Sequence, residues 1–207
     1  ETATPELAEV LAVRGARVSL GAQTFDAGLL RTLERRADPA TVERAVATLR
    51  AAGVRAAMVA PLLLGLDAVR ALAASSGVAL VGHPSFAGSL VAPRLGFAPE
   101  LLFGDLFRIA GCDAVIYPNA GGRFPFTLGD CRRIQHRLLA PLGALRPAFA
   151  MVAGGIDAAH LERWLPEYAV DTIFLVGGNL LGRPDVRAAA AELSELVAGA
   201  ARRKGRR

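Results

Sequence analysis

The stretch Pro147–Ile156, PAFAMVAGGI, joins an unbroken apolar run to a pair of glycines. Its apolar part, Pro147–Ala153, shows no alternation of polar and apolar residues, which predicts a strand buried on both faces, as in a parallel sheet. Four further runs share this pattern, and a fifth, Ala16–Ala22, shows it less clearly. The four clear runs are Arg55–Leu62, Val78–Gly82, Asp113–Pro118 and Asp171–Val176.

Helical patterns separate these runs. In Asp38–Ala52, Asp38 is suited to the N-cap, Pro39 to the first turn and Gly53 to the C-terminal stop. The strands begin about every 20 to 35 residues, which is the βα period of an α/β fold with a parallel sheet. A doubly wound sheet and a (β/α)8 barrel both fit this period, and six strands fall short of the eight that close a barrel. The other predicted helices are Ala27–Arg36, Pro99–Ala110, Gly129–Leu139, Ala158–Leu165 and Pro184–Ala198.

Composition narrows the class of protein. Of the 207 residues, 53% are apolar, which is enough for a substantial core and excludes a mainly disordered chain. The most apolar region, residues 54–82, is broken by Arg55, Pro61, Asp67 and Arg70, so no stretch reaches the roughly 20 residues of a membrane span. Two cysteines are too few for a disulfide scaffold, and no apolar leader opens the chain, which favours a cytoplasmic protein.

The basic residues are distributed unevenly. The net charge is +5, but five of the 24 basic residues lie at 202–207, and without them acidic and basic residues balance at 19 each. We expect residues 201–207 to form a disordered basic tail and the neutral body not to bind nucleic acid. Lys204, in that tail, is the only lysine. A Schiff-base lysine, a P-loop lysine and a carbamylated lysine ligand are therefore all excluded from the body.

In both candidate architectures, ligands bind where strands run into their following loops. The last two predicted strands end in Gly154-Gly155 and in Gly177-Gly178. Glycine pairs in tandem predict a phosphate site, because bare backbone N–H groups can approach an anion and the next helix adds its positive end. The alternative is two tight turns that require a positive φ.

Three further strand-end residues are candidates for catalysis. His83 follows the predicted strand Val78–Gly82 and is suited to acid–base work near neutral pH, although a lone histidine is often structural. Asn119 follows Asp113–Pro118, where its amide is suited to donating to an enolate or carbonyl oxygen, and Arg123 is suited to holding a phosphate or carboxylate.

Other polar residues carry weaker signals. Asp67 fits the first turn of a helix, and His136 and His160 fall within helical patterns as surface or core side chains. Neither zinc, nucleophile-elbow nor P-loop motifs occur in the sequence.

Four motifs resemble the C-terminal barrel of the RuBisCO large-subunit superfamily, most closely its non-carboxylating branch, the RuBisCO-like proteins. They are HPSFAGS (His83–Ser89), LLFGDLFRIAGCDAVIYPNAGGRFPF (Leu101–Phe126), AGGI (Ala153–Ile156) and FLVGGNLLGRP (Phe174–Pro184). The resemblance implies an incomplete (β/α)8 TIM-type barrel, in which residues 38–200 supply strands 4 to 8. Residues 1–37 match poorly and supply at most strand 3.

The resemblance also assigns roles. His83 matches a strand-5 histidine that faces the substrate, and the two glycine pairs match the phosphate-binding glycines of strands 7 and 8. Asn119–Arg123 matches the start of a mobile loop that carries a catalytic lysine in carboxylating members. This chain has no lysine there, and Pro84 replaces an arginine of those members, so carboxylation of ribulose bisphosphate is not expected.

The family's N-terminal α+β domain and its strands 1 and 2 have no counterpart in the matched region. Those strands carry the lysine, Asp and Glu ligands of Mg²⁺, so the cofactor is implied by the resemblance while its ligands are not expected in this chain. The family's active site also forms between two subunits, which implies a homodimer of the intact protein. The chain is thus expected to be the C-terminal part of a RuBisCO-like protein.

Several functions follow from these observations. The first is an enzyme that acts on a phosphorylated ketose or keto-acid through an enediolate, as an isomerase, enolase or decarboxylase. The second is an inactive fragment that retains only a phosphate-binding half-site. The third is an unrelated phosphate-binding TIM barrel, and the fourth, disfavoured by the neutral body, is a nucleic-acid-binding module.

Overall fold

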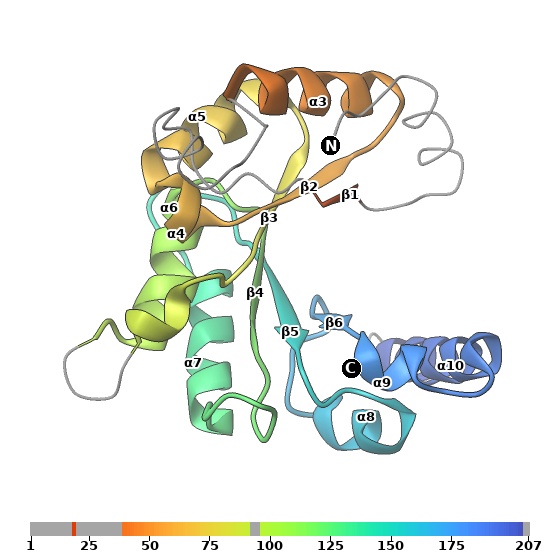
Figure 1. Cartoon of the computed structure of the whole chain (residues 1–207). Helices are drawn as coiled ribbons and strands as arrows, with labels where there is room; N and C mark the ends of the chain where they lie inside the picture. Colours follow the sequence, from red (N-terminus) through yellow and green to blue (C-terminus); the bar gives the residue numbers. More distant parts are fainter. Residues whose placement is uncertain (1–17, 20–38, 92–95, 205–207) are drawn as a thin grey trace.

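The computed structural model describes residues 18–19, 39–91 and 96–204 (Figure 1). Within them, six parallel strands form one sheet in the order β1-β2-β3-β4-β5-β6. The strands are β1 (Val18–Ser19), β2 (Ala56–Val59), β3 (Ala79–Gly82), β4 (Ala114–Pro118), β5 (Phe149–Ala153) and β6 (Ile173–Leu175). Each coincides with one of the six runs predicted as strands.

The strand order decides between the two candidate architectures. A doubly wound sheet reverses its strand order at a switch point, whereas barrel strands pair in chain order throughout. Here every strand pairs with its neighbours in the sequence, as in a barrel. Among the described residues β1 and β6 each have one partner, so this part of the chain forms an open parallel sheet rather than a closed barrel.

The helices follow the predicted alternation with some differences. Helix α5 (Leu66–Ser76) was anticipated only by Asp67, which fits a first helical turn, and the predicted helix at 27–36 lies outside the described residues. Pro61 and Leu62, predicted at the end of a strand, begin α4 (Pro61–Leu64) instead, because proline lacks the N–H that a central strand donates. The remaining helices are α3 (Pro39–Ala51), η1 (Ala87–Ser89), η2 (Glu100–Leu106), α6 (Phe107–Ile109), α7 (Leu128–Leu139), α8 (Ala158–Trp164), α9 (Gly178–Leu181) and α10 (Val186–Lys204).

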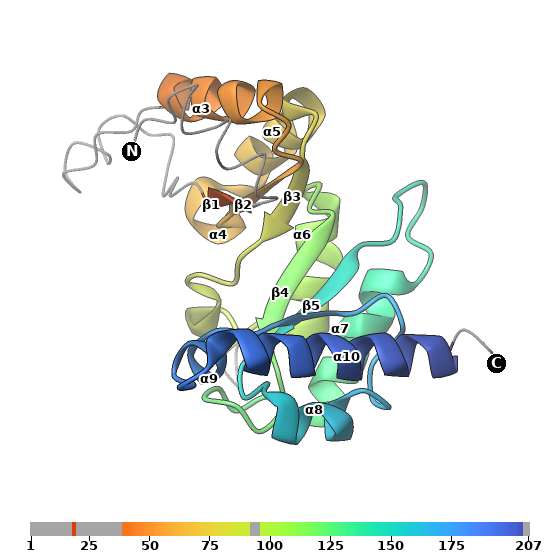
Figure 2. The ribbon, with the colours of Figure 1, turned by 90° about the vertical axis from the view of Figure 1, so that its right-hand side faces the viewer.

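Helix α10 runs alongside α8 and α9 (Figure 2). It continues to Lys204, so residues 201–204, which the sequence places in a disordered tail, are helical. Residues 205–207 lie outside the described part. In residues 39–91 and 96–204, no helix has both the length and the apolar character that crossing a membrane requires.

Side-chain alternation gives the sheet two different faces. On the helix-covered face, Leu80, Val115, Tyr117 and Val152 are fully buried and belong to the main core together with helix residues such as Phe107. On the opposite face, a smaller cluster contains Val81, Ala114, Ile116 and Met151. The continuous apolar runs predicted strands that are buried on both faces. This holds for the central residues of β3, β4 and β5, whereas β2 and β6 are only partly buried on the second face.

Helix α7 illustrates how local sequence sets an element that the core then uses. Thr127 and Asp130 form a reciprocal capping box: the Thr127 hydroxyl accepts from the Asp130 N–H at 3.1 Å, and an Asp130 carboxylate oxygen accepts from the Thr127 N–H at 2.8 Å. Cys131, Ile134 and Leu138 then face the sheet at helical spacing and are fully buried. Both cysteines, Cys112 and Cys131, are free and buried.

A buried arginine closes the other end of α7. Arg108, only 3% exposed, donates to four backbone carbonyl oxygens, those of Arg137, Ala140, Leu145 and Arg146, at 2.7 to 3.1 Å. These include carbonyls at the end of α7 that have no partner within the helix. Arg108 thereby fixes the loop that leads into β5.

Candidate active site

The loop after β5 contains a glycine turn. Gly154 and Gly155 have φ values of 102° and 65°, which L side chains rarely adopt. The backbone conformation therefore requires glycine at both positions, as the tight-turn alternative predicts. The turn is also open: a Cβ on Gly154 would meet nothing within 4 Å, and one on Gly155 would meet only the Cα of Gly122, at 3.9 Å.

The second glycine pair has a different character. Gly177 and Gly178 do not have positive φ values, both are exposed, and a Cβ on either would meet nothing within 4 Å. Neither a positive φ nor crowding by the described residues therefore accounts for glycine here. Gly178 begins α9, which has only four residues, so this loop offers the N–H groups of one helical turn rather than the dipole of a long helix.

One carboxylate connects the two glycine loops. Asp157, two residues after Gly155, is the N-cap of α8, and its Oδ1 accepts from the His160 N–H at 2.9 Å and contacts His160 Nδ1 at 2.8 Å. Its Oδ2 accepts from Nδ2 of Asn179 at 3.2 Å, and Asn179 directly follows Gly178. Partial burial alone would raise the pKa of Asp157, but the hydrogen bonds from His160 and Asn179 lower that pKa below its ordinary value.

A pocket of about 460 Å³ lies where the loops after β4, β5 and β6 meet. The loop after β4 contributes Gly121 and Thr127, and α8 contributes Arg163 and Trp164, whose ring lies 4.8 Å from the Arg163 guanidinium. Of the predicted site residues, Gly155 lines this pocket, and Gly178 lines a neighbouring one of about 440 Å³ between α8, α9 and α10. The first pocket is further lined by Ala120, Phe126, Leu128, Asp157, His160 and Asn179.

His83 continues β3 on the opposite face of the sheet, two residues after Val81. Its Nδ1 lies 2.7 Å from the Ser85 hydroxyl, which fixes the ring and leaves Nε2 as the other ring atom available to a ligand. Burial lowers the pKa of His83, which keeps the imidazole neutral near pH 7. A neutral, oriented imidazole is able to accept a proton.

Asn119 lies elsewhere than the sequence suggests. It shares the helix-covered face with Tyr117 and is fully buried. Its Oδ1 accepts from the Tyr168 hydroxyl at 2.6 Å and from the Ala120 N–H at 2.9 Å, while its buried Nδ2 has no partner. In this geometry Asn119 anchors the start of the loop after β4 and does not present its amide to a ligand.

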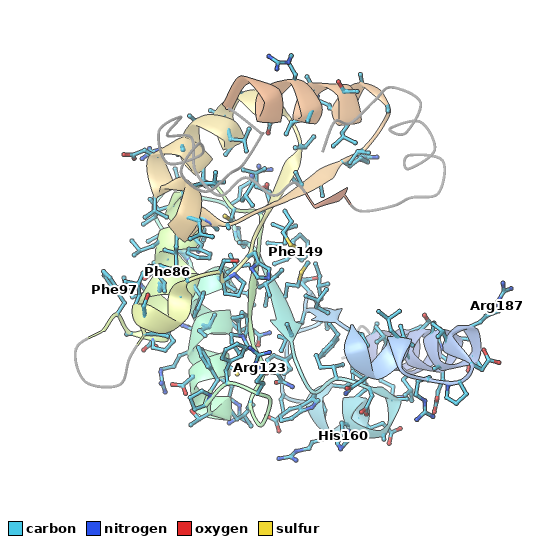
Figure 3. All side chains as sticks on the ribbon, viewed as in Figure 1. Phe86, Phe97, Arg123, Phe149, His160 and Arg187 are labelled. Atoms are coloured by element: carbon cyan, nitrogen blue, oxygen red, sulfur yellow. The ribbon has the colours of Figure 1, made fainter. Side chains whose placement is uncertain are left out.

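Arg123 is exposed in the same loop, and its guanidinium lies 5.3 Å from the Phe124 ring centre. Figure 3 places Arg123 and His160 toward the carboxyl ends of β4 and β5, whereas Phe149 marks the start of β5. The loops that carry Arg123 and the Gly154–Gly155 turn therefore occupy the same end of the sheet.

The sequence missed Asp157 and Asn179, and it assigned His160 no role beyond a surface or core position. The signal for Asp157 is local: an Asp directly before a helical pattern is a typical N-cap. Its bond to Asn179 has no local signal, because 22 residues separate the two. Asp67 is in the first turn of α5, as expected, and His136 lies in α7.

The described residues do not fit a magnesium site. Within them, no group of three or more His, Cys, Asp or Glu side chains comes close enough together to hold a metal ion. The only lysine of the sequence lies at the end of α10. The chemistry proposed for this chain therefore rests on its own side chains and backbone.

Known proteins resemble this arrangement in sequence and in structure. The chain is 37% identical, over 153 residues, to 5-methylthioribulose-1-phosphate isomerase of Rhodospirillum rubrum, a match of 73% of this chain and 40% of the relative. It is 30% identical, over 124 residues, to 2,3-diketo-5-methylthiopentyl-1-phosphate enolase of Geobacillus kaustophilus, covering 58% of this chain and 30% of that enzyme. The crystal structure of a RuBisCO-like protein from Rhodopseudomonas palustris superposes with a TM-score of 0.71 at 26% identity, over 93% of this chain and 48% of that one.

The chain is a homologue of the RuBisCO-like proteins. The family resemblance that its motifs indicate is thereby confirmed, as is the α/β fold with a parallel sheet. No family model matches the chain. This RuBisCO-like chain spans about two fifths of the length of the first of these curated relatives and about half of the solved structure.

Proposed function

We propose that this chain contributes a phosphate-binding part of the active site of a non-carboxylating enzyme that acts on a phosphorylated ketose or keto-acid. The observation that carries the proposal is the pair of exposed glycine loops at the ends of the adjacent strands β5 and β6. Both leave backbone N–H groups accessible, and Asp157 and Asn179 join them. Backbone N–H groups in such loops are suited to binding a phosphate.

The names of the relatives support the same substrate class. One is an isomerase of a 1-phosphorylated ribulose derivative, and the other is an enolase of a 1-phosphorylated diketone. Both reactions move a proton on a carbon beside a carbonyl group. We assign that proton transfer to His83, because it is held neutral by burial and oriented by Ser85. Arg123 supplies a positive charge toward the same end of the sheet.

Binding of inorganic phosphate to the chain tests the first part of the proposal. Gly178→Ala adds a methyl group where nothing lies within 4 Å, so the protein itself accommodates it while the approach of an anion is hindered. We expect phosphate affinity measured by calorimetry to fall about tenfold, equivalent to about 1.4 kcal/mol, with an unchanged melting temperature. Gly199→Ala in α10 is the matched control, since Arg203 there has a flexible side chain that can give way. Equal phosphate affinities of wild type and Gly178→Ala, or no binding by wild type, would refute the site.

The catalytic part needs the phosphorylated substrate. His83→Gln is expected to abolish exchange of the substrate proton with solvent, while phosphate affinity stays within about twofold of wild type. Undiminished exchange in this variant would remove His83 from the reaction. The homodimer that the resemblance implies is likewise a proposal, and sedimentation of the intact protein tests it.

A further inference from the structure

Asp157 makes more contacts than a helix cap needs. One of its oxygens, Oδ1, already serves α8 through the His160 N–H and ring nitrogen. The other oxygen, Oδ2, reaches across to Asn179 in the loop after β6. Asp185 provides the comparison within the same chain, because it accepts from the Ala188 N–H at 2.9 Å near the start of α10 through one oxygen only.

The hydrogen bonds of Asp157 lie close in the sequence to both glycine pairs. Asp157 follows Gly155 by two residues, and Asn179 follows Gly178 by one. The bond between the two side chains therefore spans the gap between the β5 loop and the β6 loop, next to the N–H groups of both glycine pairs. Packing holds the second loop only in part, because α9 has no fully buried residue and its Leu181 is 74% exposed, while Leu180 is partly buried against the main core.

The charge of Asp157 argues against direct binding of an anion by this residue. Its carboxylate would repel a phosphate, but all three of its recorded partners are nitrogen atoms that can donate to it and so offset the charge. Both of its oxygens already accept hydrogen bonds from these partners. The carboxylate thus acts on the glycine loops through Asn179 and α8 and not through the ligand.

We propose that Asp157 is a positioning residue that sets the spacing of the two glycine loops through Asn179, and that this spacing determines the affinity for phosphate. The inference rests on the proposed function, since it concerns the same site. Its consequence is that removal of either partner weakens anion binding without removing any group that touches the anion.

The test compares four variants of the chain with inorganic phosphate as the probe. Asp157→Ala and Asn179→Ala are each expected to weaken phosphate binding roughly 3- to 10-fold, as for one lost hydrogen bond to a charged group. The double variant is expected to be no weaker than Asp157→Ala alone, because both changes break the same link. Asp157→Asn is expected to restore affinity to within about twofold of wild type, since its amide can pair with the Asn179 amide.

Asp185→Ala is the matched control for loss of a helix cap. It is expected to lower the melting temperature about as much as Asp157→Ala while leaving phosphate affinity unchanged. If Asp157→Ala behaves like Asp185→Ala in both measurements, Asp157 is only a cap and the inference is wrong. An additive loss in the double variant would also overturn it.

A measurement without ligand separates this inference from the proposed function. In amide NMR spectra, Asp157→Ala is expected to shift the N–H signals of Gly177 and Gly178, whereas Asp185→Ala leaves them in place. If wild type binds no phosphate but these signals shift, the proposed function and the effect on affinity both fail, and only the positioning of the loops by Asp157 stands. If phosphate binds and neither the signals nor the affinity respond to Asp157→Ala, the positioning role fails and the proposed function stands.

Discussion

The two faces of the sheet differ in what they contribute. On the helix-covered face, Leu80, Val115, Tyr117 and Val152 are all fully buried beneath helices. On the opposite face the cluster is small, and four of the residues packed against it are only partly buried: Met58, Ala153, Ile173 and Leu175. Most of the stabilising burial therefore lies on the first face, and the second face is less completely covered.

The same alternation sorts the polar residues at the strand ends. His83 falls on the face of Val81, where a ligand can approach, and Asn119 falls on the face of Tyr117, beneath the helices. Two residues that look equivalent in the sequence, each directly after a strand, thus have opposite surroundings. A position at a strand end indicates function only together with the face on which its side chain lies.

The largest expected effect tests the difference between the faces directly. Leu80→Ala removes a fully buried side chain from the helix-covered face and is expected to lower the free energy of unfolding by about 2–5 kcal/mol. Met58→Ala, on the opposite face, is expected to cost about 1 kcal/mol because its side chain is only partly buried. Denaturant unfolding measures both, and equal losses would show that the two faces contribute alike.

The second prediction concerns a polar contact behind the helix-covered face. Arg108→Met keeps much of the side-chain volume but leaves four carbonyl oxygens without their donor, so we expect a loss of about 2–4 kcal/mol. Arg108→Lys retains one charged donor group and should fall between wild type and Arg108→Met. Urea titration of the three proteins gives the ranking. A stable Arg108→Met variant would mean that water replaces the arginine without cost.

The third prediction separates a structural Asn119 from a catalytic one. Asn119→Ala removes the acceptor of the 2.6 Å hydrogen bond from the buried Tyr168 hydroxyl and is expected to cost about 1–3 kcal/mol of unfolding free energy. Tyr168→Phe removes the same hydrogen bond, so the double variant should lose less than the two single losses combined. Phosphate affinity of Asn119→Ala is expected to stay within about twofold of wild type. A large loss of affinity in a variant with native stability would return Asn119 to the binding site.

Much of the fold follows from the sequence, because its signals are local. Each of the six apolar runs became a strand, and the helices at 39–51, 128–139 and 158–164 begin and end within about two residues of the predicted bounds. Pro39 was predicted from its neighbours to start a helix and does so, whereas Pro61, predicted to end a strand, begins α4. The π-helical geometry of η2, which packs against α7, has no such local signal.

The candidate site was less predictable from the sequence, because part of it depends on contacts between residues that are distant in the sequence. The two glycines of each pair are adjacent in the sequence, so both pairs were predicted as site residues. The Asp157–Asn179 hydrogen bond joins two separate loops and was not predicted. Part of the orientation of Asn119 could be predicted from the sequence. Side chains alternate along the strand Asp113–Pro118, so Tyr117 and Asn119 lie on the same face of the sheet. What the sequence lacks is the identity of the face that the helices cover.

The smallest expected effect is a pH dependence that comes from His83. Burial lowers its folded-state pKa below the ordinary value of 6.5, so the unfolded chain binds the proton more readily than the folded chain. Stability is then fully present above the unfolded pKa and is lost as the pH falls from about 6.5 toward the folded pKa. The measurement is the change in unfolding free energy between about pH 7.5 and pH 5.5 in wild type and in His83→Gln. The difference between the two proteins isolates the contribution of His83, because the rest of the sequence is identical in both. We expect wild type to lose more stability than His83→Gln on acidification, and equal losses would place His83 in solvent, away from the partly covered face on which its proposed role depends.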